Sequence, residues 1–232
     1  MKILVCDTSG GVASCALAER GKVAAEINLR TGLTHSEKLL PAIEQALALA
    51  DWKFSDLEAL GVVAGPGSFT GLRIGAATVK GLAFALNLPV VPVGTLEALA
   101  WNLPGYPGIV APLLDARRGE VYAAAYRWNG SDWTEVLPPR AEALDDFLVT
   151  LPKGESVAFL GDGVAPNESK LAAFPGAFLV PEALRLQRAA CVAEAAFRHI
   201  EKGDMLSAAD FLPDYLRDSS AVPPEGLKLW DF

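Results

Sequence analysis

The sequence predicts an α/β fold of two duplicated lobes, each with a mixed sheet flanked by helices. Strand and helix signals alternate over roughly the first hundred residues, and this alternation favours a mixed sheet over an all-helical fold. A strand that ends in an aspartate and continues into two further strands occurs twice, and Asp7 and Asp115 hold matching places in the two copies. Self-similarity over about a hundred residues indicates a duplicated lobe, although strand–turn–strand units that merely resemble one another would give the same pattern.

The first lobe is expected to run strand, strand, strand, helix, strand, helix, strand. The expected ranges are 2–7, 12–18, 23–29, 35–50, 59–64, 68–86 and 90–93. The strands are short apolar runs bounded by turns. The first helix is identified by apolar residues at three- and four-residue spacing, among them Leu39, Leu40, Ile43 and Leu47.

The second lobe begins after a stretch rich in proline and glycine at 103–108, so we place the lobes at 1–104 and 105–232. Its first three strands are expected at 109–115, 120–128 and 133–137. A helix and an apolar strand with a glycine-rich turn at 158–164 follow, and a terminal helix covers 191–203. The order of elements therefore repeats that of the first lobe.

Composition excludes several classes of function. The chain has 232 residues and a formal net charge of −8, with 20 basic and 28 acidic side chains. An acidic protein is poorly suited to wrap bare nucleic acid by itself, because phosphate binding needs Lys and Arg to displace counterions. The two histidines, His35 and His199, lie far apart in the chain and provide few ligands for a histidine-based metal site.

Cysteine usage and hydropathy indicate the compartment. Cys6, Cys15 and Cys191 are odd in number and form no CxxC pair, so we expect neither disulfides nor a zinc site and predict a reducing cytoplasm. The N-terminal apolar run is too short for a signal peptide. Prolines interrupt the longest uncharged stretches, so no membrane span is expected.

The segment 64–75, AGPGSFTGLRIG, is the best candidate for an anion site. It follows an expected strand, opens an expected helix, and carries Gly65, Gly67, Gly71, Ser68 and Thr70. Glycines let backbone N–H groups approach an anion, and a helix N-terminus adds partial positive charge. Residues 59–96 contain no acid, and their basic residues are Arg73 and Lys80. The segment lacks the lysine of a phosphate-binding P-loop, and a structural turn that needs positive φ remains the alternative.

The two aspartates at strand ends are the second candidate. Asp7 is followed by Thr8 and Ser9 in DTSGG, whereas Asp115 is followed by two arginines in DARRGE. Two carboxylates that face each other across a cleft could hold Mg²⁺ and through it a nucleoside triphosphate. The alternative is that both aspartates cap turns, as Asp commonly does.

The expected helix after the glycine-rich loop is dense in small residues, including Gly71, Gly75 and Gly81. Glycine inside a helix costs about 1 kcal/mol relative to alanine, so three of them imply that another backbone approaches closely. That backbone could belong to the helix's own sheet. It could instead belong to a partner, in which case Leu40, Ile43 and Leu47 could supply the apolar half of the interface.

Four segments together resemble the family of bacterial TsaB subunits of the tRNA threonylcarbamoyladenosine machinery. They are ILVCDTSGGVASCAL, THSEKLLPAIEQAL, VVAGPGSFTGLRIGAATVKGLA and LLDARRGEVYAAAY. The resemblance implies the actin-like, Hsp70-like ATPase fold. It also implies a role in attaching threonylcarbamoyl to N6 of the adenosine beside the anticodon, in tRNAs that read codons beginning with A.

The resemblance further implies a division of labour. In that family the chemistry belongs to a paralogue, TsaD, which binds nucleotide and a metal held by an HxxxH pair. TsaB is a scaffold that dimerises with TsaD or with itself, and a small ATPase, TsaE, joins the pair. The chain would then need no catalytic residue, metal or cofactor of its own, ATP and Mg²⁺ would belong to its partners, and tRNA would be contacted through the complex. The implied interface residues are Leu39, Leu40, Ile43, Leu47, Gly71, Gly75, Thr78, Val79 and Leu82.

The residues themselves favour a non-catalytic subunit, because no HxxxH pair exists and DARRGE replaces a glycine-rich phosphate loop. GDGVAPN at 161–167 resembles the adenosine-side loop of the active paralogue, so weak nucleotide binding stays open. The alternative function is a free-standing actin-like ATPase or a peptidase that uses the cleft between Asp7 and Asp115.

Overall fold

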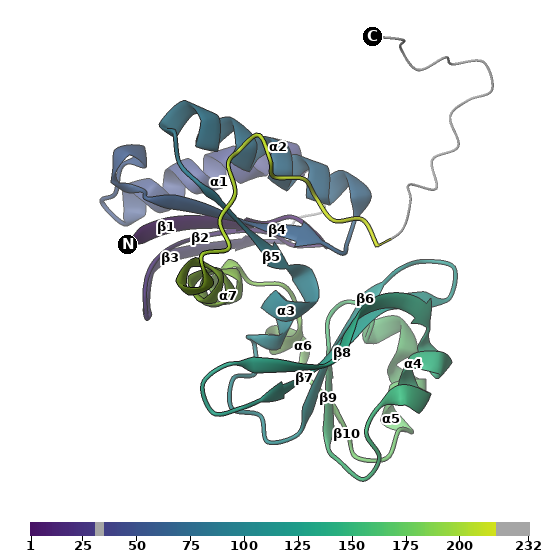
Figure 1. Ribbon diagram of the computed structural model, residues 1–232. Coiled ribbons are helices and arrows are strands. Elements are labelled where there is room, and N and C mark those ends of the chain that lie inside the picture. The colour runs from purple at the N-terminus through teal and green to yellow at the C-terminus, as the bar shows by residue number, and fades with distance from the viewer. Residues whose placement is uncertain (31–34, 217–232) are drawn as a thin grey trace, which may run out of the picture.

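The computed structural model describes residues 1–30 and 35–216, which form two lobes around two five-stranded sheets (Figure 1). The first sheet contains β1 (Lys2–Asp7), β2 (Ala13–Glu19), β3 (Lys22–Leu29), β4 (Ala59–Gly65) and β5 (Val90–Gly94). The second contains β6 (Ile109–Asp115), β7 (Glu120–Trp128), β8 (Trp133–Ala143), β9 (Val157–Leu160) and β10 (Ala177–Leu179). The α-helices are α1 (His35–Leu49), α2 (Phe69–Leu86), α3 (Thr95–Ala100), α4 (Leu144–Thr150), α5 (Glu168–Ala172), α6 (Glu182–Arg185) and α7 (Ala189–Lys202). Two 3₁₀ turns, η1 (Phe54–Asp56) and η2 (Ala165–Asn167), complete the described chain.

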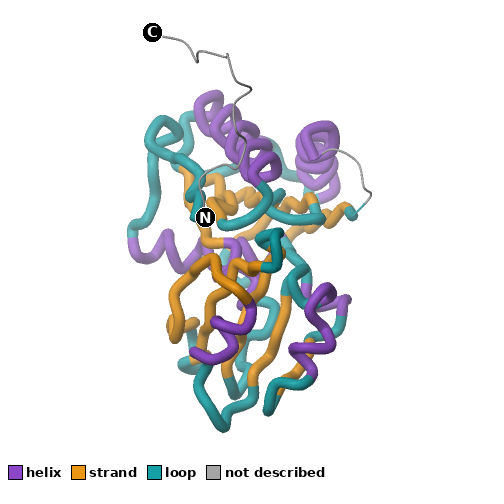
Figure 2. The backbone as a smooth tube through the Cα atoms, turned by 90° about the vertical axis from the view of Figure 1, so that its right-hand side faces the viewer, coloured by secondary structure: helices purple, strands orange, loops and turns teal. Residues whose placement is uncertain are grey.

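The two sheets have the same topology. Their strand orders are β3-β2-β1-β4-β5 and β8-β7-β6-β9-β10. In each sheet the first three strands are antiparallel, and the first strand then pairs in parallel with the fourth, as Ile3 does with Ala59 and Ile109 with Val157. The predicted fold of two duplicated lobes, of the actin-like kind, is therefore confirmed. Figure 2 shows the two sheets one above the other along the vertical axis of the view.

Helices cover both faces of the first sheet. Side chains alternate between faces along a strand, so Leu4 and Cys6 pack beneath α1 and α2 while Ile3 and Val5 face α7 (Figure 1). A sheet covered on both faces can carry apolar residues at every position. This explains why β1 and β2 read as continuous apolar runs rather than as alternating ones.

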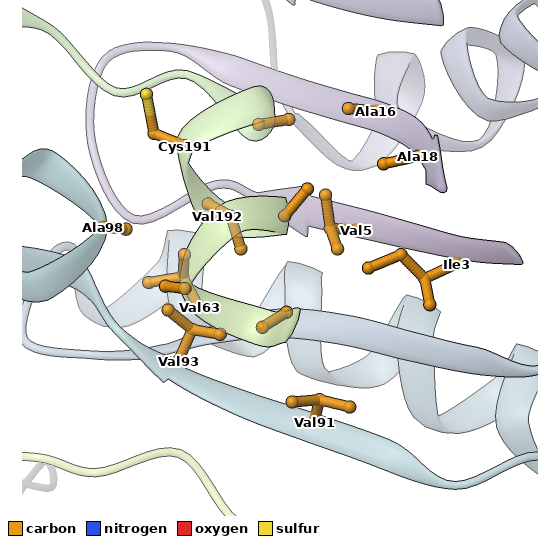
Figure 3. Packing of buried hydrophobic residues seen from close by; sticks show 14 of the residues in the cluster. Ile3, Val5, Ala16, Ala18, Val63, Val91, Val93, Ala98, Cys191 and Val192 are labelled. Carbon is orange, nitrogen blue, oxygen red and sulfur yellow. The ribbon is translucent and has the colours of Figure 1, made fainter. Parts of the chain in front are cut away.

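The terminal helix α7 departs from the expected division into lobes. The sequence assigned residues 105–232 to the second lobe, yet α7 packs against β1, β2 and β5 of the first sheet. Figure 3 shows Val192 of α7 beside Val5 and Val63, with Ile3, Val91 and Val93 on the same face of the sheet. The amphipathic pattern of a helix shows that one of its faces is buried, but not which sheet buries it. The sequence of α7 therefore could not show which lobe the helix covers.

The second sheet is also covered on both faces. Leu144 and Phe147 of α4 and Leu171 of α5 pack on one face, together with Ile109 and Leu113 of β6. Leu96, Leu99 and Ala100 of α3 pack on the other face with Val110, Ala124 and Tyr126. The short helix α3 therefore lies between the two lobes, as Figure 1 shows.

After α7 the chain returns across the edge of the first sheet. Leu206 forms a two-way backbone pair with Val90, at 2.8 and 2.9 Å, and Phe211 is fully buried against α2. The backbone of Asp214 then donates to the Ala64 carbonyl at 2.8 Å. We call residues 204–216 the strap, because they tie α2 and β5 to the end of β4.

Within the part of the chain that the structure describes, α2 alone is long and apolar enough to cross a membrane. Its buried residues, which include Leu72, Ala76 and Val79, pack on the first sheet. Core helices of water-soluble proteins share this length and composition, so α2 is weak evidence for a membrane span.

Candidate functional site

The two lobes enclose a cleft with a volume of about 1080 Å³. Six segments form it: the loop after β1, the glycine-rich loop with the start of α2, the loop after β6, β7 at Tyr122, the turn after β9, and the end of the strap. Of the predicted site residues, Ser9, Gly67, Ser68, Thr70 and Asp115 line the cleft. Sequence reasoning did not select several other lining residues, namely Gly10, Gly11, Arg117, Arg118, Tyr122, Asp162, Asp214 and Tyr215.

Asp7 lies beneath the cleft rather than on its surface. Its side chain is 1% exposed, and its Oδ1 accepts hydrogen bonds from the Ser9 backbone N–H at 2.8 Å and from Ser9 Oγ at 2.6 Å. Burial raises the pKa of the Asp7 carboxyl, and the two hydrogen bonds from Ser9 oppose that rise. Asp7 therefore holds the tight turn of DTSGG through Oδ1, whereas its Oδ2 is buried without a partner among the described residues.

The glycines of the glycine-rich loop allow the loop after β1 to approach the start of α2. A Cβ at Gly71 would overlap the Thr8 carbonyl oxygen, and one at Gly75 would lie 2.6 Å from Thr8 Oγ1. Thr8 Oγ1 donates to the Gly71 carbonyl at 2.7 Å. The backbone that approaches this helix so closely belongs to the same chain, and it explains both glycines without a ligand.

Gly65 and Gly67 are each approached closely by a backbone carbonyl oxygen from another segment of the chain. Gly65 has a φ of 137°, where residues with a Cβ are strained, and its α-carbon faces the Asp214 carbonyl oxygen of the strap. A Cβ at Gly67 would lie 2.5 Å from the Ser9 carbonyl oxygen, which accepts from the Ser68 N–H at 2.7 Å. The turn with positive φ, offered as the alternative to an anion loop, is present at Gly65.

The N-terminus of α2 is capped by its own residues. Ser68 is the N-cap, and its Oγ accepts from the Gly71 N–H at 3.3 Å. Such a cap satisfies one of the free amides that would otherwise face a ligand. The side chains of Ser68 and Thr70 still line the cleft.

Arg73 does not line the cleft. It follows Phe69 by four residues, one turn of helix, and its guanidinium lies 3.7 Å from the centre of the Phe69 ring. Both residues line a groove of about 400 Å³ with Ser36, Ile74 and Thr78. Helix geometry thus places Arg73 on the face shared with α1 rather than in the cleft, and its contribution to an anion site stays a prediction.

The loop after β6 is arranged around Asp115. Asp115 Oδ1 accepts from the Arg117 backbone N–H at 2.8 Å, and the Asp115 N–H donates to Asp162 Oδ1 at 3.0 Å. Arg117 and Arg118 have φ values of 64° and 56°, in the left-handed region. Asp115, like Asp7, thus caps its own turn.

Asp162 is the second-lobe carboxyl that acts on Asp7. Its charge raises the pKa of Asp7, after burial as the main cause, and burial also raises the pKa of Asp162 itself. The sequence paired Asp7 with Asp115 from the duplication and did not use Asp162, which is nevertheless visible in GDGV. In the described ranges 1–30 and 35–216, no three His, Cys, Asp or Glu side chains lie close enough together to hold a metal ion.

Several predicted interface residues are buried inside the chain. Leu39, Ile43, Leu47 and Val79 are at most 5% exposed and pack on the first sheet. They cannot also face a partner, so their assignment to an interface is wrong. Gly71 and Gly75 are buried beneath the loop after β1, and Thr78 and Leu82 are half-buried. The apolar residues spaced three and four apart therefore form the buried face of the helix, which packs on the chain's own sheet.

Helices α1 and α2 also carry exposed apolar residues, and Leu49 lies on the opposite side of α1 from Leu40, nine residues away. Leu40 is 42% exposed, as the predicted interface requires, and Leu49 and Phe84 are 71% and 64% exposed. Sequence reasoning did not select Leu49 and Phe84, because single apolar residues outside a periodic stripe give no signal. We call the surface that includes Leu40, Phe84 and the groove that holds Arg73 the α1–α2 face.

The two histidines lie on different helices. His35 Nε2 lies 2.9 Å from the Gly10 carbonyl oxygen beside the cleft. His199 of α7 contacts Glu97 of α3 at 3.0 Å and Asp204 at 3.4 Å, and these contacts raise the pKa of His199.

Residues 29–222 match the family model of TsaD, the tRNA N6-adenosine threonylcarbamoyltransferase. The chain is 35% identical to the tRNA threonylcarbamoyladenosine biosynthesis protein TsaB of Bacillus subtilis over 95% of this chain and 96% of that one. It is 33% identical to TsaB of Escherichia coli, with the same two coverages. Among solved structures it resembles YeaZ from Pseudomonas aeruginosa, with a TM-score of 0.80, 28% identity, and coverage of 92% of this chain and 99% of that one.

Proposed function

Because the chain belongs to the TsaB family of tRNA threonylcarbamoyladenosine biosynthesis proteins, we propose that it acts there as a non-catalytic subunit. It takes part in tRNA threonylcarbamoyladenosine biosynthesis, as its relatives do. Its role in this proposal is to bind and activate a TsaD-like catalytic paralogue, which attaches threonylcarbamoyl to N6 of the adenosine beside the anticodon. A TsaE-like ATPase joins the pair. The subunit works in the cytoplasm and needs no cofactor of its own, since ATP and Mg²⁺ belong to its partners.

The α1–α2 face carries this proposal. It exposes Leu40 and Phe84 together with a groove, and exposed apolar surface of this kind marks protein contacts. The helices remain those that the sequence predicts, and the contact residues are the exposed ones in place of Leu39, Ile43, Leu47 and Val79. The same face serves self-association when the catalytic paralogue is absent, so homodimer and heterodimer exclude each other.

Three observations support the absence of chemistry in this subunit. The chain contains two histidines, on different helices, so it cannot form an HxxxH pair. In Asp7 and Asp115, one carboxylate oxygen accepts a hydrogen bond from a backbone N–H of the turn that follows the aspartate. The net charge of −8 fits a subunit that serves tRNA through protein contacts rather than by binding its phosphates alone.

The interface is tested by analytical ultracentrifugation of the full chain with the catalytic paralogue from the same genome. The variant carries Leu40→Glu and Phe84→Glu, and each change places a charge on an exposed side chain that the heterodimer would bury. We expect at least about thirtyfold weaker association, because loss of an interface anchor costs about 2 kcal/mol or more. Threonylcarbamoyladenosine formation in the reconstituted system should fall in parallel.

Val149→Glu is the matched control. Val149 is 77% exposed on α4 of the second lobe, so the same change is made far from the α1–α2 face. Wild-type association in the double variant, or equal weakening by Val149→Glu, would overturn the interface. Micromolar binding of Mg-ATP to the isolated chain that is lost in Asp7→Asn would overturn the non-catalytic role and favour the ATPase alternative.

A further inference from the structure

A second, smaller hollow of about 310 Å³ lies beside the cleft and shares Pro66, Asp214 and Leu216 with it. Both lobes form its walls: the end of β4 and the start of α3 from one side, β7 and β8 from the other, and the strap across them. Apart from Gly65, none of the residues predicted for the anion site or the partner interface lines it. A ligand in this hollow would therefore be independent of the proposed function.

The strand register brings two polar side chains into this hollow. Tyr126 of β7 and Glu135 of β8 are directly opposite each other in the antiparallel ladder, so their side chains lie on the same face of the sheet. This is the face that α3 covers, and Glu97 of α3 also lines the hollow. Asp214 enters from the strap.

The hollow is acidic. Glu97, Glu135 and Asp214 line it, whereas no Lys, Arg or His of the described residues does so. Glu97 is bonded to His199, but the carboxylates of Glu135 and Asp214 have no ion pair within the described part of the chain. Among residues 1–30 and 35–216, two of the three charges therefore have no ion-pair partner.

Tyr126 adds an independent observation. The residue is 5% exposed and lines the hollow, yet its hydroxyl has no hydrogen-bond partner among residues 1–30 and 35–216. The phenol oxygen is therefore available to a ligand in the hollow, toward which it can both donate and accept. Burial, and then the charges of Glu97 and Glu135, raise the pKa of Tyr126, which keeps the phenol protonated.

We propose that this hollow binds a small organic cation with a primary ammonium or guanidinium group. The N–H donors of such a group are matched by the Glu135 and Asp214 carboxylates and by the Tyr126 oxygen, which can accept while its own O–H donates to a carboxylate. Leu96 and the ring of Trp133 supply apolar walls for a short carbon chain, and the buried Trp133 indole N–H, which has no acceptor among the described residues, belongs to the same lining residue. A bare metal ion fits less well, because the described residues bring no three carboxylates, histidines or cysteines within metal-binding reach.

The volume also fits this class of ligand. Ligand pockets typically measure about 300–1,000 Å³, so a hollow of about 310 Å³ takes a diamine or an amino-acid side chain and excludes a nucleotide. The bound cation would contact both lobes and the strap, and so would fix their relative positions.

The probe is agmatine, which carries an ammonium and a guanidinium, titrated into the full chain by calorimetry at low ionic strength. We expect saturable binding of one agmatine per chain. Glu135→Gln should weaken it by about tenfold, the equivalent of about 1.4 kcal/mol for one charge-assisted contact. Tyr126→Phe should weaken it several-fold without lowering the melting temperature, because the hydroxyl has no partner in the described part of the folded chain.

Glu44→Gln, on the exposed side of α1, removes the same charge away from the hollow and should leave agmatine binding unchanged. Equal weakening by Glu44→Gln and Glu135→Gln would reduce the effect to general charge and overturn the proposal. Failure to saturate, unchanged affinity in both Glu135→Gln and Tyr126→Phe, or displacement of agmatine by an equal concentration of Mg²⁺ would also overturn it.

Discussion

The three glycines of α2, Gly71, Gly75 and Gly81, differ in their structural roles. Gly71 and Gly75 of α2 face the loop after β1, where Thr8 leaves no room for a side chain. Gly81 lies nearly two turns further along, is exposed, and has no atom within 4 Å of the position that its Cβ would take. The first two glycines are therefore required by packing inside the chain, whereas the third only weakens the helix.

Replacement by alanine should have opposite effects at the two ends of α2. Gly71→Ala is expected to lower the free energy of unfolding by about 1–3 kcal/mol, because the new methyl group displaces the loop after β1. Gly81→Ala is expected to raise it by about 0.5–1 kcal/mol through helix propensity. Urea unfolding of both variants measures this. A stabilised Gly71→Ala variant would show that the contact with Thr8 is not tight.

Residue patterns identified the candidate loops but not the partners of each side chain. DTSGG and GPGSFTG are recognisable because their residue types are unusual, and both border the cleft. That Asp7 turns inward to Ser9, or that Arg73 stacks on Phe69, depends on side-chain directions that spacing along the chain does not encode. Asp162 could have been found from its place in GDGV, which matches the glycine-rich turn after β4 in the duplicated lobe.

Among the elements, α7 and α3 are joined by one titratable contact. His199 of α7 contacts Glu97 of α3 and Asp204 beyond the helix end, and a histidine near the C-terminus of a helix is also favoured by the helix dipole. These contacts favour the protonated ring, so the pKa of His199 is raised above 6.5 in the folded chain. The stabilisation is complete below the unfolded pKa and is lost as the pH rises through the folded pKa.

The difference in unfolding free energy between the wild type and His199→Gln should therefore shrink as the pH rises from below 6.5 through the raised pKa of His199. Denaturant unfolding at a series of pH values measures it. The control is the same comparison in a Glu97→Gln background, where most of the pH dependence should disappear because the first cause of the pKa shift is gone. A difference that grows with pH would mean that burial, which lowers the pKa of His199, outweighs the contacts.

The duplicated topology of the two lobes was predictable from the sequence, whereas the path of the chain between the lobes was not. Matching Asp-ended strands at Asp7 and Asp115 suffice to predict two copies of one unit. The coverage of the first sheet by α7 is a contact between distant parts of the chain, and amphipathic periodicity shows only that a helix has a buried face. The same limit applied to α1 and α2, where the buried stripe was mistaken for a partner surface.

The chain path predicts which fragments fold. Residues 1–104 lack α7, so Ile3, Val5 and Val63 would lie bare on one face of the first sheet. Both cores of the second sheet are instead contained in residues 95–186. We expect fragment 1–104 to aggregate when expressed alone and fragment 95–186 to be soluble with a cooperative thermal transition, as followed by circular dichroism. A soluble, cooperatively unfolding fragment 1–104 would contradict the need for α7.

The return of α7 to the first sheet also separates the order of synthesis from the order of folding. During synthesis, the strands of the first sheet are made well before α7, the helix that covers one of their faces. At about 5–20 residues per second, the delay between the synthesis of β5 and that of α7 amounts to roughly 5–20 s. The second lobe, which needs nothing made later, can complete itself during that wait. The oldest part of the nascent chain is then the last to be finished, and it is the part for which a chaperone would compete.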